Sequence, residues 1–134
     1  MTLRTLLLSD GTSVTALEAG SGEPLLLIHG VGMRAEAWAP QIEALAADYR
    51  VIAVNMPGHG GSDPLADGAR LPDYVAWAES VVRALELGSV NVAGHSMGAL
   101  IAAGLAAEHP ALVRRLAVLN AVHCRSPEAR ASVL

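Results

Sequence analysis

The segment Gly94–Gly98 reads Gly-His-Ser-Met-Gly, the pattern G-x-S-x-G. It follows Ser89–Ala93, which we expect to form a buried strand, and precedes the alanine-rich helical segment Ala99–Glu108. A serine at a sharp turn from strand to helix has a strained backbone and an exposed hydroxyl, and flanking glycines avoid clashes with neighbouring chain. We therefore predict that Ser96 is a nucleophile. The turn around it is formed by Gly94, His95 and Gly98.

A second glycine-rich turn, His29–Gly32, follows the apolar run Leu25–Ile28. In parallel sheets the ligand-binding loops lie at the carboxyl ends of the strands, so we expect this turn to lie beside Ser96. Acyl transfer requires two N–H donors about 3 Å from the developing oxyanion. We predict that the main-chain N–H groups of Val31 and Met97 are these donors. The residues expected to brace the turn by hydrogen bonding are His29 and Gly30.

A serine nucleophile also needs a general base and an acid that orients the base. The acids and histidines after Ser96 are Glu108, His109, His123 and Glu128. The first two lie at the far end of the helix that starts near Ser96, about 18 Å away at about 1.5 Å per residue. Glu108 is the only acid between Ser96 and His123, and it is too distant from Ser96 to take part. Asn120 follows the last apolar run, but it carries no charge that could orient a histidine. We expect the triad acid and histidine to lie outside this chain.

Hydrophobic periodicity predicts strands and helices in alternation. The expected strands are Leu3–Leu8, Ser13–Ala19, Leu25–Ile28, Val51–Val54, Ser89–Ala93 and Leu116–Leu119. The expected helices are Ala35–Tyr49, Leu71–Leu85 and Ala99–Glu108. Asp10-Gly11 suits a tight turn, so the first two strands should pair antiparallel. The predicted fold class is α/β, with a mostly parallel sheet of about six strands, helices on both faces and an N-terminal antiparallel hairpin.

Composition limits the domain count and the function class. We expect one incomplete domain over residues 1–134, in which 120–134 start an unfinished cap or connecting segment. Thirteen acidic and nine basic groups give a net charge of −4 without a basic run, which argues against nucleic-acid binding. No secretory signal or apolar run of about 18 residues is present, and the single cysteine, Cys124, fits a reducing compartment, so we expect a cytoplasmic protein without membrane contact. The scattered histidines predict no metal site.

Three motifs, in this order, resemble those of α/β-hydrolase-fold serine hydrolases, close to the small esterases, enol-lactonases and cofactor-free haloperoxidases. They are His29-Gly30 with Trp38 in the following helix, Pro57–Ser62 after the next strand, and Gly94–Gly98. Together they correspond to the N-terminal half of that fold. The resemblance implies the roles given above for Ser96, Val31 and Met97, structural roles for His59 and His95, and no cofactor. Where the family usually has an aspartate after the second parallel strand, this chain has the uncharged Asn55.

The leading hypothesis is a serine hydrolase that cleaves a small ester or lactone through an acyl-enzyme. Apolar residues expected near the cleft, which indicate an apolar acyl group, are Val31, Met33, Met56 and Met97. Without the acid and histidine, this chain should be weakly active or inactive alone. The alternative is a non-catalytic remnant that binds an acyl ligand or a partner. We also expect self-association through the open edge of the last strand, or complementation by a C-terminal segment.

Overall fold

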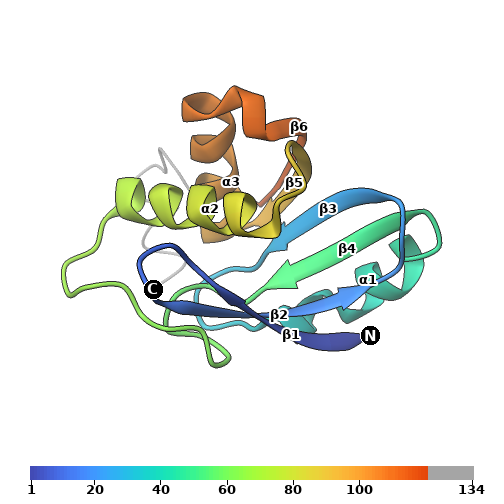
Figure 1. Cartoon of the computed structure of the whole chain (residues 1–134), viewed down its shortest axis with the longest axis horizontal. Helices are drawn as coiled ribbons and strands as arrows, with labels where there is room; N and C mark the ends of the chain where they lie inside the picture. The colour runs from blue at the N-terminus through green and yellow to red at the C-terminus, as the bar shows by residue number, and fades with distance from the viewer. Residues whose placement is uncertain (121–134) are drawn as a thin grey trace, which may run out of the picture.

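A computed structural model describes residues 1–120 and shows one six-stranded sheet with helices on its faces (Figure 1). The strands are β1 (Thr2–Leu7), β2 (Ser13–Ala19), β3 (Glu23–Ile28), β4 (Tyr49–Val54), β5 (Val90–His95) and β6 (Val113–Leu119). The α-helices are α1 (Ala39–Leu45), α2 (Leu71–Leu85) and α3 (Met97–Glu108), and the 3-10 helices are η1 (Ala35–Trp38) and η2 (Pro110–Leu112). This confirms the predicted α/β class.

The strands lie in the order β1-β2-β4-β3-β5-β6. The pair β1 and β2 is antiparallel, as the turn at Asp10-Gly11 predicts, and β2 also pairs antiparallel with β4. From β4 to β6 all pairs are parallel. In this register Ile28 pairs with Gly94, and Gly94 with Val118. The carboxyl ends of β3, β5 and β6 therefore meet at one edge of the sheet.

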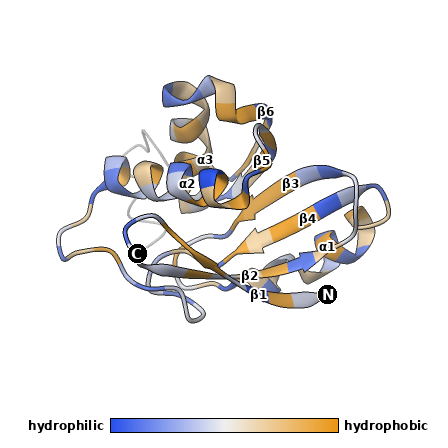
Figure 2. Cartoon of the chain, in the orientation of Figure 1, coloured by the Kyte–Doolittle hydropathy of each residue, from blue (hydrophilic) through white to orange (hydrophobic). Residues whose placement is uncertain are grey.

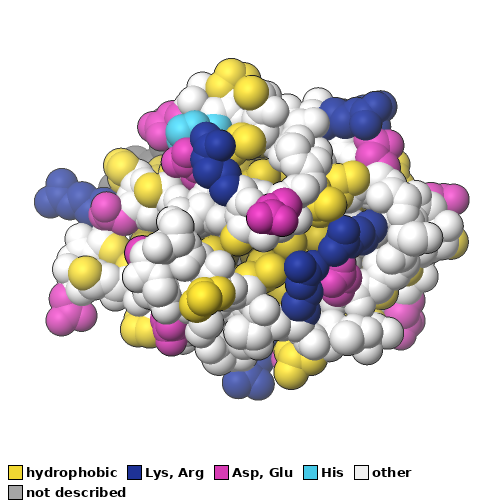
Figure 3. All heavy atoms as spheres, viewed as in Figure 1, with side chains coloured by type: hydrophobic (Ala, Val, Ile, Leu, Met, Phe, Trp, Pro, Cys, Tyr) yellow, Lys and Arg dark blue, Asp and Glu magenta, His cyan; other side chains and the backbone are white. Residues whose placement is uncertain are grey.

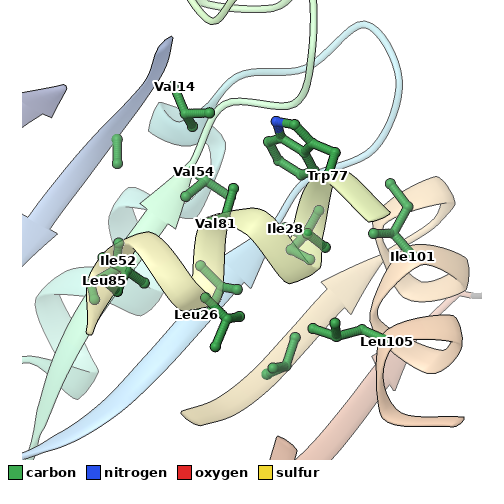
Figure 4. Packing of buried hydrophobic residues seen from close by; sticks show 14 of the residues in the cluster. Val14, Leu26, Ile28, Ile52, Val54, Trp77, Val81, Leu85, Ile101 and Leu105 are labelled. Carbon is green, nitrogen blue, oxygen red and sulfur yellow. The ribbon is translucent and has the colours of Figure 1, made fainter. Parts of the chain in front are cut away.

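Side chains of the central strands alternate between two hydrophobic clusters, one on each face. On one face α2 and α3 pack on Leu26, Ile28, Ile52 and Val54, and Figure 4 shows Trp77 and Val81 of α2 among these residues. On the other face η1 and α1 pack on Leu27, Val51 and Ala53. Burial on both faces explains why β3 and β4 are hydrophobic over their carboxyl-terminal parts (Figure 2). Each fully buried leucine or isoleucine contributes about 1.5–3 kcal/mol.

The predicted helix Ala35–Tyr49 is wrong in its extent. The segment divides into η1 and the seven-residue helix α1, and Tyr49 is the first residue of β4, where it pairs with Glu23. Pro40, in the first turn of α1, has no N–H to donate to the preceding turn, so one continuous helix does not form. Tyr49 matches the helical spacing of Trp38 and Ile42 but belongs to the sheet.

The predicted boundaries around the serine motif also change. Strand β5 continues through Gly94 and His95, which pair with Val118 and Leu119, although the sequence suggested an end at Ala93. Helix α3 begins at Met97 rather than at Ala99. Parallel pairing with β3 and β6 extends the strand, because those neighbours satisfy the backbone groups of the two added residues. Ser96 is thus the only residue between strand and helix.

Strand β6 lies at one end of the sheet order. Its apolar side chains Leu116, Val118 and Leu119 are 42%, 48% and 46% exposed. Next to it a groove of about 420 Å³ is lined by Leu25, Leu27 and Trp38, among other residues. In contrast, acidic and basic side chains are interspersed over the face of the molecule seen in Figure 3. Within residues 1–120, no helix has the length and apolarity needed to cross a bilayer.

Candidate active site

Ser96 lies in a backbone conformation that is rare for a residue with a side chain. Its φ is 58° and its ψ is −119°, between the last residue of β5 and the first of α3. The Ser96 N–H donates to the carbonyl of Leu119 at 2.9 Å, and its own carbonyl accepts from the N–H of Ala99 at 3.0 Å. Such strain costs of the order of 1–3 kcal/mol and persists only where the surrounding structure holds it.

The two glycines of the motif allow this strained turn to pack closely. A Cβ at Gly94 would overlap the carbonyl of Gly98, and a Cβ at Gly98 would overlap the carbonyl oxygen of Ile28 at the end of β3. These neighbours are backbone atoms, which cannot rotate away. Glycine at both positions therefore lets α3 begin directly against β3 and β5. The positive end of the α3 dipole then lies at Ser96.

The turn after β3 lies against the nucleophile. A Cβ placed on Gly30 would be 3.1 Å from the Cβ of Ser96. The N–H of Met33 donates to the carbonyl of Gly30 at 3.1 Å, and Gly32 has a φ of 81°, as expected for a type II turn. Val31 is the first central residue of this turn, and its side chain is 69% exposed. The structure therefore brings together the two segments from which the sequence predicts oxyanion donors.

His29 is almost fully buried, with 1% of its surface exposed. Its Nε2 accepts the N–H of Met56 at 3.0 Å, so its Nδ1 carries the proton and donates to the carbonyl of Gly30 at 2.7 Å. Burial lowers the pKa of His29, and the nearby His59 lowers it further. A neutral ring with both nitrogens engaged is suited to holding the turn and unsuited to proton transfer.

Asn55, in the loop after β4, is buried and hydrogen-bonds both to β2 and to the start of η1. The Asn55 Oδ1 accepts the N–H of Ala35 at 2.8 Å, and the Asn55 Nδ2 donates to the Thr15 hydroxyl at 2.8 Å. The hydroxyl of Ser62 donates to the Asn55 carbonyl at 2.7 Å. A Cβ at Gly60 would overlap the Asn55 side chain, which explains that glycine. Asn55 thus supplies one acceptor and one donor without a buried charge.

His95 lines a cavity of about 200 Å³ together with residues that include His29, Met33, Trp38 and Leu119. Its Nε2 lies 3.3 Å from the Nδ2 of Asn120, the amide from which it can accept a hydrogen bond. Of the residues expected to form an apolar cleft, Met33 lines this cavity. Met56 instead lies in the core beneath α2, with 1% exposed, so its expected place at the cleft is wrong.

The remaining candidates for a base or acid are distant or lie outside the described residues. His109 follows the far end of α3, and its Nε2 lies 3.2 Å from Glu79, so it belongs to the contact between α3 and α2. His123, Cys124, Glu128 and the segment beyond residue 120 fall outside the part that the structure describes. In that part, no three histidine, cysteine, aspartate or glutamate side chains lie close enough together to hold a metal ion.

Comparison with known proteins identifies the family. Residues 23–131 match the family model described as alpha/beta hydrolase fold. The chain belongs to this family, which confirms the resemblance carried by the three motifs.

Individual relatives are hydrolases by name. The chain is 52% identical over its whole length to (E)-2-((N-methylformamido)methylene)succinate hydrolase of Acinetobacter baylyi, of which it covers 51%. It is 35% identical over 84% of its length to pimeloyl-[acyl-carrier protein] methyl ester esterase of Aeromonas hydrophila, of which it covers 43%. The crystal structure of E-2-(acetamidomethylene)succinate hydrolase superposes with a TM-score of 0.90 at 28% identity, over 98% of this chain and 48% of that one. The chain therefore spans about half the length of these relatives.

Proposed function

We propose that this chain carries the nucleophile and the oxyanion-binding groups of a hydrolase that acts through an acyl-enzyme. The observation that supports this most strongly is the conformation of Ser96, with a φ of 58° at the start of α3 and the Gly30 turn against its Cβ. A strained serine at that position exposes its hydroxyl beside two sets of main-chain N–H groups. The N–H of Met97 is among the first of its helix, which have no acceptor within the helix.

In the proposed reaction the hydroxyl of Ser96 attacks the carbonyl carbon of the substrate. The oxyanion that forms accepts hydrogen bonds from the N–H groups of Val31 and Met97. The leaving group departs with a proton, an acyl ester forms on Ser96, and water then releases the acid and regenerates the hydroxyl. A general base must take the serine proton. His29 and His109 are engaged elsewhere, so we propose that this base and its acid come from chain beyond residue 120.

The relatives favour a particular class of substrate. Two of them are named for 2-(amidomethylene)succinates, which join a small acyl group to a dicarboxylate through an amide. We therefore propose that the whole protein cleaves the C–N bond of such an amide, with formyl or acetyl as the group carried by Ser96. Ester cleavage is the second candidate, supported by the esterase among the relatives.

The nucleophile is tested by labelling with a fluorophosphonate, which reacts with activated serines. We expect slow labelling of this chain at Ser96, loss of labelling in Ser96→Ala, and no change in Ser89→Ala, which alters an exposed serine outside the site. Added 2-(acetamidomethylene)succinate should slow the labelling more than an equal concentration of p-nitrophenyl acetate. Labelling that survives in Ser96→Ala would remove the assignment, and stronger competition by the ester would favour the second candidate.

A further inference from the structure

The turn after β3 and the loop after β4 hold each other through two histidines. His29, in the turn, accepts the N–H of Met56 at 3.0 Å, and His59, in the loop, accepts the N–H of Gly32 at 2.9 Å. Because both Nε2 atoms accept, both rings carry the proton on Nδ1. His59 donates that proton to the carbonyl of Pro57 at 3.0 Å. The ring centroids are 5.2 Å apart.

The bond to Gly32 determines the orientation of one particular peptide. The N–H of Gly32 belongs to the peptide that joins Val31 to Gly32, at the centre of the turn. Type I and type II turns differ by a flip of this central peptide. The hydrogen bond that closes the turn, from the Met33 N–H to the Gly30 carbonyl, forms in either orientation. The His59 acceptor selects one of them, because only that one points the N–H at its ring.

We propose that His59 is a positioning residue: by tying the Val31–Gly32 peptide to the loop after β4, it keeps the whole turn in place beside Ser96, including the adjacent Gly30–Val31 peptide that carries the N–H of Val31. It contacts no reacting atom. The link to the oxyanion rests on the function proposed above, whereas the bracing of the turn does not depend on it. His59 thereby serves the reaction, whereas the motif resemblance implies only a structural role for it.

The test compares His59→Leu, which keeps volume but removes the acceptor, with His59→Gln, whose amide oxygen can accept in the same place. Amide hydrogen exchange of Gly32 is followed by NMR in the 134-residue chain, together with the rate of fluorophosphonate labelling of Ser96. In His59→Leu we expect Gly32 to exchange about fivefold faster and labelling to slow by a similar factor, as suits the loss of one hydrogen bond. His59→Gln should restore both.

The matched control is Ser62→Ala in the same loop. It removes the hydrogen bond that the Ser62 hydroxyl donates to the Asn55 carbonyl and the one that it accepts from the Thr15 N–H, but it leaves the contact between His59 and Gly32. We expect it to lower stability without changing Gly32 exchange or labelling. Unchanged Gly32 exchange in His59→Leu, or equal slowing of labelling in both His59 variants, would overturn the proposal. If wild-type Ser96 is not labelled at all, the proposed function fails, and Gly32 exchange alone decides whether His59 braces the turn.

Discussion

Replacing Gly98 with alanine should move the start of α3 away from the Gly30–Met33 turn that follows β3. In Gly98→Ala the new Cβ would overlap the carbonyl oxygen of Ile28 and lie 2.6 Å from that of His29. Helix propensity alone predicts a gain of about 1 kcal/mol from this change. Overpacking typically costs about 1–3 kcal/mol, and backbone neighbours place this site in the upper part of that range. We therefore expect a net loss of about 1–2 kcal/mol, or roughly 4–8 °C in Tm.

Gly104 offers a matched control in the same helix. Its Cβ would lie 2.6 Å from Cγ2 of the buried Val75 on α2, so Gly104→Ala also strains the packing of α3 but does so against a side chain of α2 and not against the backbone at the end of β3. Urea denaturation and fluorophosphonate labelling are measured for both variants. Gly98→Ala should be less stable and labelled more slowly, because α3 carries Met97 and moves away from β3. If both variants match the wild type in stability and labelling, the close contact between α3 and the end of β3 is refuted.

Two further predictions concern pH and association. Burial lowers the pKa of His29, so below about pH 6.5 the unfolded chain binds a proton that the native chain does not, and stability falls as the pH decreases. The urea midpoint should be lower at about pH 5.5 than at about pH 7.5, with a smaller difference in His29→Gln; equal differences would show that His29 is not the cause. We also propose that the isolated chain self-associates through β6, and that Val118→Lys reduces this in sedimentation at micromolar concentration. A wild-type monomer would contradict the second prediction.

The sequence predicts the sheet and the serine motif because their signals are local. Continuous apolar runs mark β3 and β4, since both faces of these strands are buried. Gly94 and Gly98 each lie two positions from Ser96, so the motif is visible as a short pattern. The same reliance on local spacing misplaces Tyr49, because an apolar residue just after a helix fits the helical period as well as it fits a strand.

The polar contacts that organise the site could not be predicted in the same way. His29 meets Met56, and His59 meets Gly32, each across 27 positions of the chain, while Asn55 meets Ala35 across 20. These partners are backbone N–H groups, which every residue except proline carries, so the sequence holds no mark of them. The sequence does show a turn at the end of each of two adjacent parallel strands, β3 and β4. This predicts that the two turns lie close together, but not which donor meets which acceptor.

The site therefore depends on the sheet more than on its loops. Ser96 is held by the carbonyl of Leu119 at the end of β6, by the glycine contact to β3, and by the first turn of α3. These three contacts fix Ser96 and the start of α3 while charge develops on the substrate. Groups fixed in advance in this way stabilise an oxyanion. Proton transfer from Ser96 needs a group that no described residue supplies in the right place. Slow labelling of Ser96 and weak turnover are thus expected together, since the oxyanion site can be present without the base.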